Sequence, residues 1–403
     1  QGFKIIWTPF STVINNSESV IDTTVDETIF DKWLPQLAHD FTYNRNLSLK
    51  TENFQVEQQF PLAWNPDFKD KPKIYAFPFD SRRVGEYRVR APLSYLSAKG
   101  LIESSLANNH NQLIMPSITE MQRLDPDVIW LQNGFFAPIN ARWQNYVKFS
   151  KAFKICGIDD FEQTLLRKYT LSGTPPDSLN NILADHLQYV DRIIVSNKIL
   201  AETLAPLCDS EILIVPDYLD NAWWKGVKIP EKPMRKKLRI GWTNSTEELG
   251  EVDFIVPVLN ALKTEVDWVF IGNCLPELNP NIEMISYPQN LANLDLDLAL
   301  IPQVANKFNE TKSNIRLLEY GFMGWPVICS DLASYHDNTP PVMYLANESQ
   351  LWIDAIQELI KIPDNLIRQG QLLREWVLQH YMLADHIDEW HAAIMPKLND
   401  SFE

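Results

Sequence analysis

The chain contains 403 residues, with a formal net charge of −16 at pH 7, 45% hydrophobic residues and 22% charged residues. This composition is ordinary for a globular chain that buries a core, and the length favours two domains. Because an acidic surface repels phosphate backbones, nucleic acid is excluded as an expected partner.

The four cysteines, Cys156, Cys208, Cys274 and Cys329, are far apart in the sequence and form no zinc motif. Each lies in or beside an apolar run, where a free buried thiol is expected, and this suits the cytoplasm. No window reaches the roughly 18 apolar residues of a membrane span. The start at Gln1 is not a secretory signal and suggests that the chain is a fragment of a longer protein.

Short apolar runs alternate with helical stretches from residue 73 onward, whereas residues 1–70 are less regular, with a strand expected at 3–7 and a helix at 27–37. Helical periodicity occurs between the runs, for example at 93–98 and 179–189. This alternation predicts a mostly parallel sheet with helices on both faces. The predicted strands are 73–77, 112–115, 127–131, 153–156, 192–195 and 212–215.

The alternation breaks at 217–237, where Pro, Trp and basic residues predict a linker. A membrane or phosphate contact is the alternative for its basic residues. A second alternating series follows. Its predicted strands are 238–242, 268–271, 297–301 and 326–330, and its predicted helices are near 251–263, 314–323 and 348–361, with two more in 365–395.

The predicted fold class is therefore α/β, with two Rossmann-like domains whose parallel sheets face each other across a cleft. The C-terminal helix is expected to pack back on the first domain. The predicted divisions are an irregular N-terminal segment (1–70), a first domain (71–224), a linker (225–237), a second domain (238–380) and a C-terminal helix (381–403).

Small residues follow two strands of the second series. The first strand ends around Gly241 and Thr243, and the next runs into Gly272 and Asn273. Ligands of open parallel sheets bind beyond the carboxyl ends of the strands, and glycine lets backbone N–H groups approach a phosphate. We therefore predict that these residues line the binding site of a phosphate-containing donor substrate. The alternative is a plain strand-to-helix turn.

The segment around the helix at 314–323 carries the strongest pattern. Ser313 is a predicted N-cap and Gly324 a predicted helix terminator. The free N–H groups and positive dipole at the helix start favour a phosphate, and Lys312 adds a positive charge beside them. This combination suits a diphosphate leaving group, on which negative charge builds as a sugar bond breaks.

Glu319 lies at the edge of the apolar face of the same helix. A carboxylate in that position is costly unless a donor hydrogen-bonds it, and a sugar hydroxyl would serve. The alternative is a salt bridge, to Arg316 or to a distant base.

The first domain offers two further clusters. Arginines follow the strand at 73–77, among them Arg83 and Arg88, and at a strand's carboxyl end they predict an anion site, with surface arginines as the alternative. Asp159 and Asp160 follow the strand at 153–156. These carboxylates could orient an acceptor hydroxyl, act as a base, or simply cap the next helix.

These segments resemble group-1, family-4-type GT-B glycosyltransferases from about residue 71 to about residue 380. The resemblance implies that Lys312 and Ser313 hold the donor diphosphate, that Asn309 lies at the donor site and that Glu319 contacts ribose or sugar hydroxyls. The donor motif comprises Phe308-Asn309, Lys312-Ser313, Leu318-Glu319-Tyr320 and Gly324-Trp325-Pro326-Val327-Ile328-Cys329-Ser330.

One departure concerns an earlier glutamate of many family members, which is Thr311 here, with Glu310 beside it. It affects which group contacts the sugar ring.

In the first domain, the stretch after the strand at 73–77 is similar to the family's glycine loop and helix entry. The resemblance implies that Gly85 and Tyr87, with Arg83 and Arg88, contact the acceptor or a phosphate. The Asp159-Asp160 pair resembles an acidic pair of this branch. The segment 215–220 resembles the interdomain hinge, with Asp replacing the more usual Asn at 217.

The predicted function is transfer of a sugar from a nucleoside-diphosphate sugar to a glycan or lipid-linked hydroxyl acceptor. The predicted catalytic residues are Glu319, Asp159 and Asp160, and the resemblance implies retention of anomeric configuration. We expect no cofactor and no metal, because the Asp295-Leu296-Asp297 pattern lies at a strand start.

We expect a cytoplasmic enzyme of cell-surface polysaccharide or glycoprotein synthesis, with a peripheral contact at the inner membrane face or with a partner enzyme as a further option. Two alternatives to transfer are a nucleotide-sugar epimerase and a non-catalytic glycan-binding domain.

Overall fold

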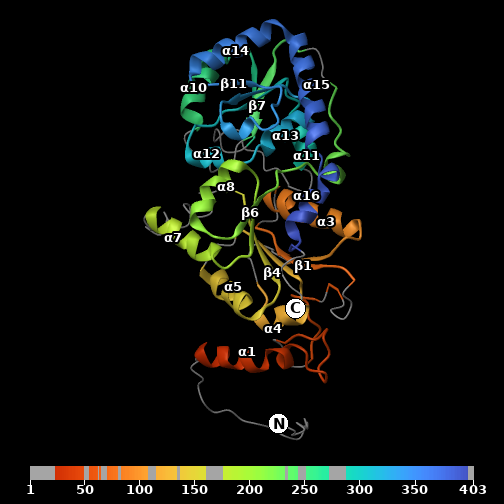
Figure 1. Cartoon of the computed structure of the whole chain (residues 1–403). Coiled ribbons are helices and arrows are strands. Elements are labelled where there is room, and N and C mark those ends of the chain that lie inside the picture. Colours follow the sequence, from red (N-terminus) through yellow and green to blue (C-terminus); the bar gives the residue numbers. More distant parts are fainter. Residues whose placement is uncertain are drawn as a thin grey trace, which may run out of the picture.

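The computed structural model describes most of the chain as two stacked α/β units (Figure 1). Each unit contains one parallel sheet with helices around it, which confirms the predicted α/β class. The strand expected at 3–7 lies outside the described residues. The structure describes residues 23–49, 54–61, 63–64, 70–79, 83–107, 115–133, 137–159, 176–231, 235–243, 251–271 and 287–397.

The first sheet has six parallel strands in the order β2-β1-β3-β4-β5-β6. Its central strands are apolar and buried, as parallel strands covered on both faces must be. The strands are β1 (Lys73–Phe77), β2 (Glu103–Leu106), β3 (Val128–Gln132), β4 (Phe153–Ile158), β5 (Arg192–Val195) and β6 (Glu211–Ile214). The helices of this part are α1 (Thr23–Ala38), α2 (Arg83–Gly85), α3 (Ala91–Ala98), α4 (Ile118–Leu124), α5 (Ala137–Phe149), α7 (Pro176–Leu187), α8 (Lys198–Leu204) and α9 (Asn221–Trp224).

One first-domain strand was not predicted. The strand β2 lies at Glu103–Leu106 and pairs with β1. It is a half-buried edge strand whose Glu-Ser-Ser-Leu sequence contains no apolar run, so periodicity does not identify it. A strand was expected at 112–115, but residues 112–114 lie outside the described part of the chain.

The second sheet has five parallel strands in the order β11-β10-β9-β7-β8. The three-residue edge strand β11 was not predicted, because so short a run carries no periodicity. The strands are β7 (Arg239–Thr243), β8 (Asp267–Ile271), β9 (Leu298–Ile301), β10 (Val327–Ser330) and β11 (Met343–Leu345). The helices are α10 (Glu251–Leu262), α11 (Tyr287–Ala292), α12 (Lys307–Thr311), α13 (Ile315–Phe322), α14 (Ser349–Lys361) and α15 (Pro363–His380).

The chain returns to the first domain after α15. Figure 1 shows the last helix, α16 (Ile387–Ile394), beside α3 and below the second sheet. Trp390 packs on Trp130 of β3, with ring centroids 5.7 Å apart. Arg192 of β5 donates to the backbone oxygen of Ala393 at 2.8 Å. The C-terminal helix therefore ties the second domain's chain to the first domain's core.

Helix α13 is held close to α15 by glycines. A Cβ on Gly321 would lie 2.6 Å from Val377, and one on Gly370 would lie 2.0 Å from the oxygen of Gly324. Gly324 adopts a φ of +72° just after the C-cap Met323, so the predicted helix terminator is confirmed. These close approaches fix the position of the helix that carries Glu319.

Candidate active site at the domain boundary

A helix with an internal π-turn follows the carboxyl end of β1. It runs through α2, the π-helix at Glu86–Arg90 and α3, and the N–H of Ala91 bonds to the oxygen of Glu86. Pro92 has no N–H, and in a regular helix its ring would clash with the carbonyl of Arg88. The wider turn accommodates this proline and buries Tyr87 and Arg88.

Glu319 is fully buried (0% exposed) and accepts three side-chain hydrogen bonds. Arg83 Nη2 lies 2.7 Å from its Oε2, Tyr287 OH lies 2.9 Å from the same oxygen, and Tyr87 OH lies 2.9 Å from Oε1. The salt bridge to a distant base that the sequence allowed is therefore present, with Arg83 as the base. Two of the three donors come from the first domain.

Electrostatics keep these donors protonated. Burial is the largest single influence on the pKa of Arg83 and lowers it. Glu319, Tyr287 and Tyr87 together outweigh burial, so the pKa is raised. Burial raises the pKa of Tyr87 and Tyr287 well above the usual tyrosine value, and the adjacent carboxylate adds to the increase. The phenols therefore act as hydrogen-bond donors to a charged acceptor.

Aromatic rings surround this cluster. Trp223 of α9 packs between the rings of Tyr87 and Tyr287 at centroid distances of 5.5 and 6.1 Å. The Arg83 guanidinium lies 4.7 Å from the Tyr287 ring. Low polarity around the ion pair strengthens each of its hydrogen bonds.

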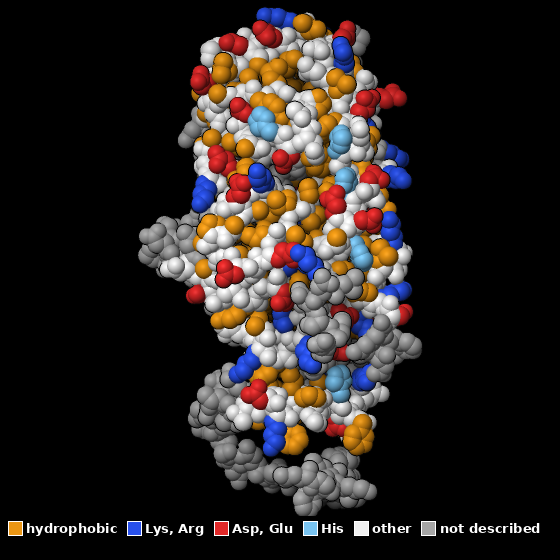
Figure 2. Space-filling view, in the orientation of Figure 1, with side chains coloured by type: hydrophobic (Ala, Val, Ile, Leu, Met, Phe, Trp, Pro, Cys, Tyr) orange, Lys and Arg blue, Asp and Glu red, His pale blue; other side chains and the backbone are white. Residues whose placement is uncertain are grey.

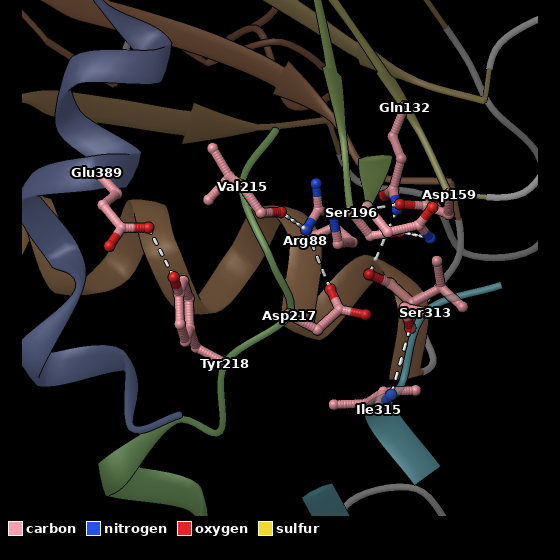
Figure 3. Close-up of polar contacts among 12 residues, drawn as sticks. Arg88, Gln132, Asp159, Ser196, Val215, Asp217, Tyr218, Ser313, Ile315 and Glu389 are labelled. Atoms are coloured by element: carbon pink, nitrogen blue, oxygen red, sulfur yellow. Dashed lines mark hydrogen bonds and ion pairs between the residues drawn. The ribbon is translucent and has the colours of Figure 1, made fainter. Parts of the chain in front are cut away.

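Arg88 forms a second buried cluster, which Figure 3 shows between the side chains of Asp217 and Asp159. Its Nη1 donates to Val215 O at 2.6 Å and to Asp217 Oδ1 at 3.1 Å, and its Nε lies 3.3 Å from Asp159 Oδ1. Its guanidinium also lies 4.8 Å from the Trp390 ring. Arg88 is 3% exposed, so the surface-arginine alternative is wrong for this residue.

Asp159 receives further donors from the end of β3. Gln132 Nε2 donates to Asp159 Oδ2 at 2.7 Å and Asn133 Nδ2 donates to it at 2.8 Å. Sequence analysis did not single out these two amides. They directly follow the predicted strand at 127–131, so the rule that selected Asp159 would have found them. Asp160 lies outside the described residues.

The predicted donor residues of β7 have structural partners. The N–H of Thr243 donates to Tyr320 OH at 2.7 Å, and its Oγ1 lies 3.0 Å from the same hydroxyl. A Cβ on Gly241 would meet Val269 O at 1.7 Å, so glycine allows β7 and β8 to pair. Gly272 and Asn273 lie outside the described residues.

The turn between α12 and α13 carries the other donor candidates. Lys312 Nζ lies 4.4 Å from the Phe308 ring, and Asn309 Nδ2 donates to Val304 O at 2.8 Å. The N-cap of α13 is Asn314 rather than Ser313, although Ser313 Oγ accepts from the N–H of Ile315 at 3.4 Å. Ser313 therefore lies two residues before Ile315, the first residue of α13, because Asn314 occupies the cap position.

The Asp-x-Asp pattern at 295–297 is explained by pairing with a base. Arg235 contacts both carboxylates, and Asp297 Oδ2 also accepts from the N–H of Arg239 at 2.8 Å. Within the described ranges, no group of three or more His, Cys, Asp or Glu side chains is placed to hold a metal ion.

Acidic side chains are scattered over the face drawn in Figure 2 and are interspersed with basic and apolar ones. The acidic composition is thus spread over this face. Among the described helices, none has the length and hydropathy required to cross a membrane.

Solved structures share this architecture at low sequence identity. Sucrose-phosphate synthase from Thermosynechococcus elongatus is 11% identical, with a TM-score of 0.59 over 80% of this chain and 98% of that chain. The catalytic domain of starch synthase IV from Arabidopsis thaliana, bound to ADP and acarbose, is 10% identical, with a TM-score of 0.56 over 80% and 98%. Anabaena HepE in complex with UDP-glucose is 10% identical, with a TM-score of 0.54 over 80% and 99%.

Comparisons with protein-family models and with curated sequences give no match. The structural likeness shows that the chain has the GT-B fold, as the motifs predicted.

Proposed function

We propose that this chain is a glycosyltransferase that moves a sugar from a nucleoside-diphosphate sugar to a hydroxyl acceptor. The observation that carries the proposal is the buried Glu319 on α13, six residues after Ser313 and directly opposite first-domain side chains. Two similar GT-B structures contain ADP or UDP-glucose, which supports a nucleotide-sugar donor.

The donor diphosphate would lie against Lys312, Ser313 and the start of α13. The acceptor oxygen bonds to the anomeric carbon while that carbon's bond to the diphosphate oxygen breaks. The lysine charge and the helix dipole stabilise the negative charge that moves onto the diphosphate. In a retaining reaction, a donor phosphate oxygen takes the acceptor proton.

Glu319 would contact hydroxyl groups of the donor. A carboxylate has about four lone-pair positions, and three are occupied here. Because Glu319 is fully buried, the donor reaches it only when the segment that carries Arg83 and Tyr87 moves away from it. The rest of the domain boundary stays closed, and Tyr287 remains with Glu319.

The acceptor would lie on the first domain near Asp159. The amides of Gln132 and Asn133 hold one carboxylate oxygen, and Arg88 lies beside the other. This arrangement fixes the Asp159 side chain so that it can orient an acceptor hydroxyl. Asp160 is assigned to the same role from the sequence.

The acceptor class that we propose is a glycan or lipid-linked glycan of cell-surface polysaccharide or glycoprotein synthesis. This part rests on the motif resemblance. The location that we propose is the cytoplasm, with a peripheral contact at the inner membrane face or with a partner enzyme as a further option.

A thermal-shift panel with UDP, GDP, dTDP, ADP and CMP tests the donor site in the wild type and in Lys312→Ala. A ligand at about 100 times its Kd stabilises the folded state by about 2.7 kcal/mol, which shifts the melting temperature visibly. We expect one nucleotide to stabilise the wild type and to have a smaller effect on the variant. Unchanged stabilisation in the variant would contradict the assignment of Lys312, and no shift with any nucleotide would contradict the proposed function.

A further inference from the structure

Asn197 lies at the carboxyl end of β5 and caps the following helix. Its Oδ1 accepts a hydrogen bond from the N–H of Leu200 at 2.9 Å, the arrangement of a helix N-cap. The side chain is 5% exposed and therefore lies away from solvent. One half of the amide is thus used inside the first domain.

The other half of the amide crosses to the second domain. Asn197 Nδ2 donates to the backbone oxygens of Thr311 and Lys312, at 2.9 and 3.2 Å. A backbone N–H at one end and carbonyl oxygens at the other leave one orientation for the amide. Figure 1 shows α8 next to α12, and Figure 3 places Ser313 near Ser196, the residue before Asn197.

The contacted backbone belongs to the turn that presents Lys312. Lys312 has extended angles (φ −67°, ψ 151°) between α12 and α13, so neither helix continues through it. The amide bonds to the carbonyl of this residue and to that of the residue before it. The position of the lysine therefore depends on a side chain of the opposite domain.

We propose that Asn197 is a positioning residue for donor binding, which holds the Lys312 turn in place for the diphosphate. The inference rests on the proposed function, because it requires that Lys312 binds a nucleoside diphosphate. Its consequence is that the first domain contributes to the affinity for a ligand held by the second domain.

The test variant is Asn197→Asp. Aspartate is an equally good N-cap and keeps the bond from Leu200, but it cannot donate to the two carbonyl oxygens. With the nucleoside diphosphate that stabilises the wild type in the five-nucleotide panel, we expect about a tenfold loss of affinity by calorimetry. Asn197→Ser, which also keeps a cap acceptor, should give a similar loss and serves if the aspartate variant fails to fold.

A matched control corrects for the added negative charge. Asn306 caps α12 through a bond from the N–H of Asn309 and is exposed. The variant Asn306→Asp places a carboxylate a few residues from Lys312 without removing an interdomain donor. We expect its affinity for the nucleotide to stay within about twofold of the wild type, because a solvated charge is screened.

The double variant Asn197→Asp/Lys312→Ala separates positioning from a purely structural role. If Asn197 acts through Lys312, adding the aspartate to Lys312→Ala should change affinity by less than about twofold. Additive losses, or a lower melting temperature with unchanged affinity in Asn197→Asp, would overturn the inference. If Lys312→Ala itself leaves the affinity unchanged, the proposed function of Lys312 fails first and the inference fails with it.

Discussion

The two buried charged clusters differ in which parts of the chain complete them. Glu319 is held by Arg83 and Tyr87 from the first domain and by Tyr287 from its own domain. Arg88, in contrast, is held by Asp159 of the first domain and by Asp217 in the segment that follows β6. A change in domain spacing therefore breaks the first cluster and leaves the second intact.

This difference indicates separate roles for two groups that look alike in the sequence. The Arg88 cluster joins the end of β4, the segment that follows β6 and the helix α16, so it holds these parts of the first domain together. The Glu319 cluster occupies the boundary itself, where a donor must enter. A buried ion pair adds little net free energy to folding, but removing one partner leaves a buried charge without compensation. We therefore expect the free energy of unfolding to fall strongly when either cluster loses one partner.

The largest expected effect comes from Arg88→Met. This change leaves the carboxylates of Asp159 and Asp217 without their shared cation, and we expect the free energy of unfolding to fall by about 3–5 kcal/mol in urea denaturation. Arg90→Met is the control on the same π-helix, because Arg90 pairs with Glu86 at 3.7 Å in a partly exposed setting. It should cost less than about 1 kcal/mol. Equal losses of unfolding free energy in the two variants would show that Arg88 does not hold these parts of the first domain together.

A smaller loss of stability is expected from Glu319→Gln, which keeps the side-chain size. The NH2 group of the glutamine cannot accept hydrogen bonds from Arg83, Tyr87 or Tyr287, so some of these bonds are lost. Arg83 also loses its counter-charge. We expect about 2–3 kcal/mol of destabilisation together with a loss of nucleotide-sugar turnover. The control is Glu358→Gln, an exposed position on α14, which should change neither. Full turnover in Glu319→Gln would remove Glu319 from the donor site.

The smallest effect distinguishes the two tyrosines of the Glu319 cluster. Tyr87→Phe and Tyr287→Phe each remove one hydrogen bond to the carboxylate and should each cost about 1–2 kcal/mol of stability. Their effects on ligand affinity should differ. If donor binding separates Tyr87 from Glu319, the hydrogen bond between them exists only in the free protein. Tyr87→Phe then destabilises the free protein and leaves the complex unaffected.

By linkage, Tyr87→Phe should then bind the nucleotide sugar about 5–10-fold more tightly than the wild type in calorimetry. Tyr287→Phe should not gain affinity, because Tyr287 stays with Glu319 in both states. Weaker binding by Tyr87→Phe would mean that the bond persists in the complex.

Most of the fold could be predicted because buried parallel strands are continuous apolar runs. The strand at 73–77 and the one at 192–195 have the predicted bounds. The half-exposed edge strands β2 and β11 were missed, since one is rich in serine and the other has only three residues. Edge strands bury less surface, so the sequence constrains them less.

The candidate site was less predictable. Local patterns selected Glu319 and Lys312, but the partners of Glu319 are distant in sequence, and Arg83 lies 236 residues away. Helix periodicity reports that a carboxylate is buried and says nothing of which donor satisfies it. The amide of Asn197 likewise looks like an ordinary helix cap until the second domain is placed beside it.

The most direct test is a crystal structure of the wild type with its nucleoside diphosphate. The account predicts phosphate groups beside Lys312 and Ser313, a ribose hydroxyl on Glu319, and Arg83 and Tyr87 separated from that carboxylate. A nucleotide bound elsewhere, or a Glu319 that keeps all three side-chain donors in the complex, would contradict it.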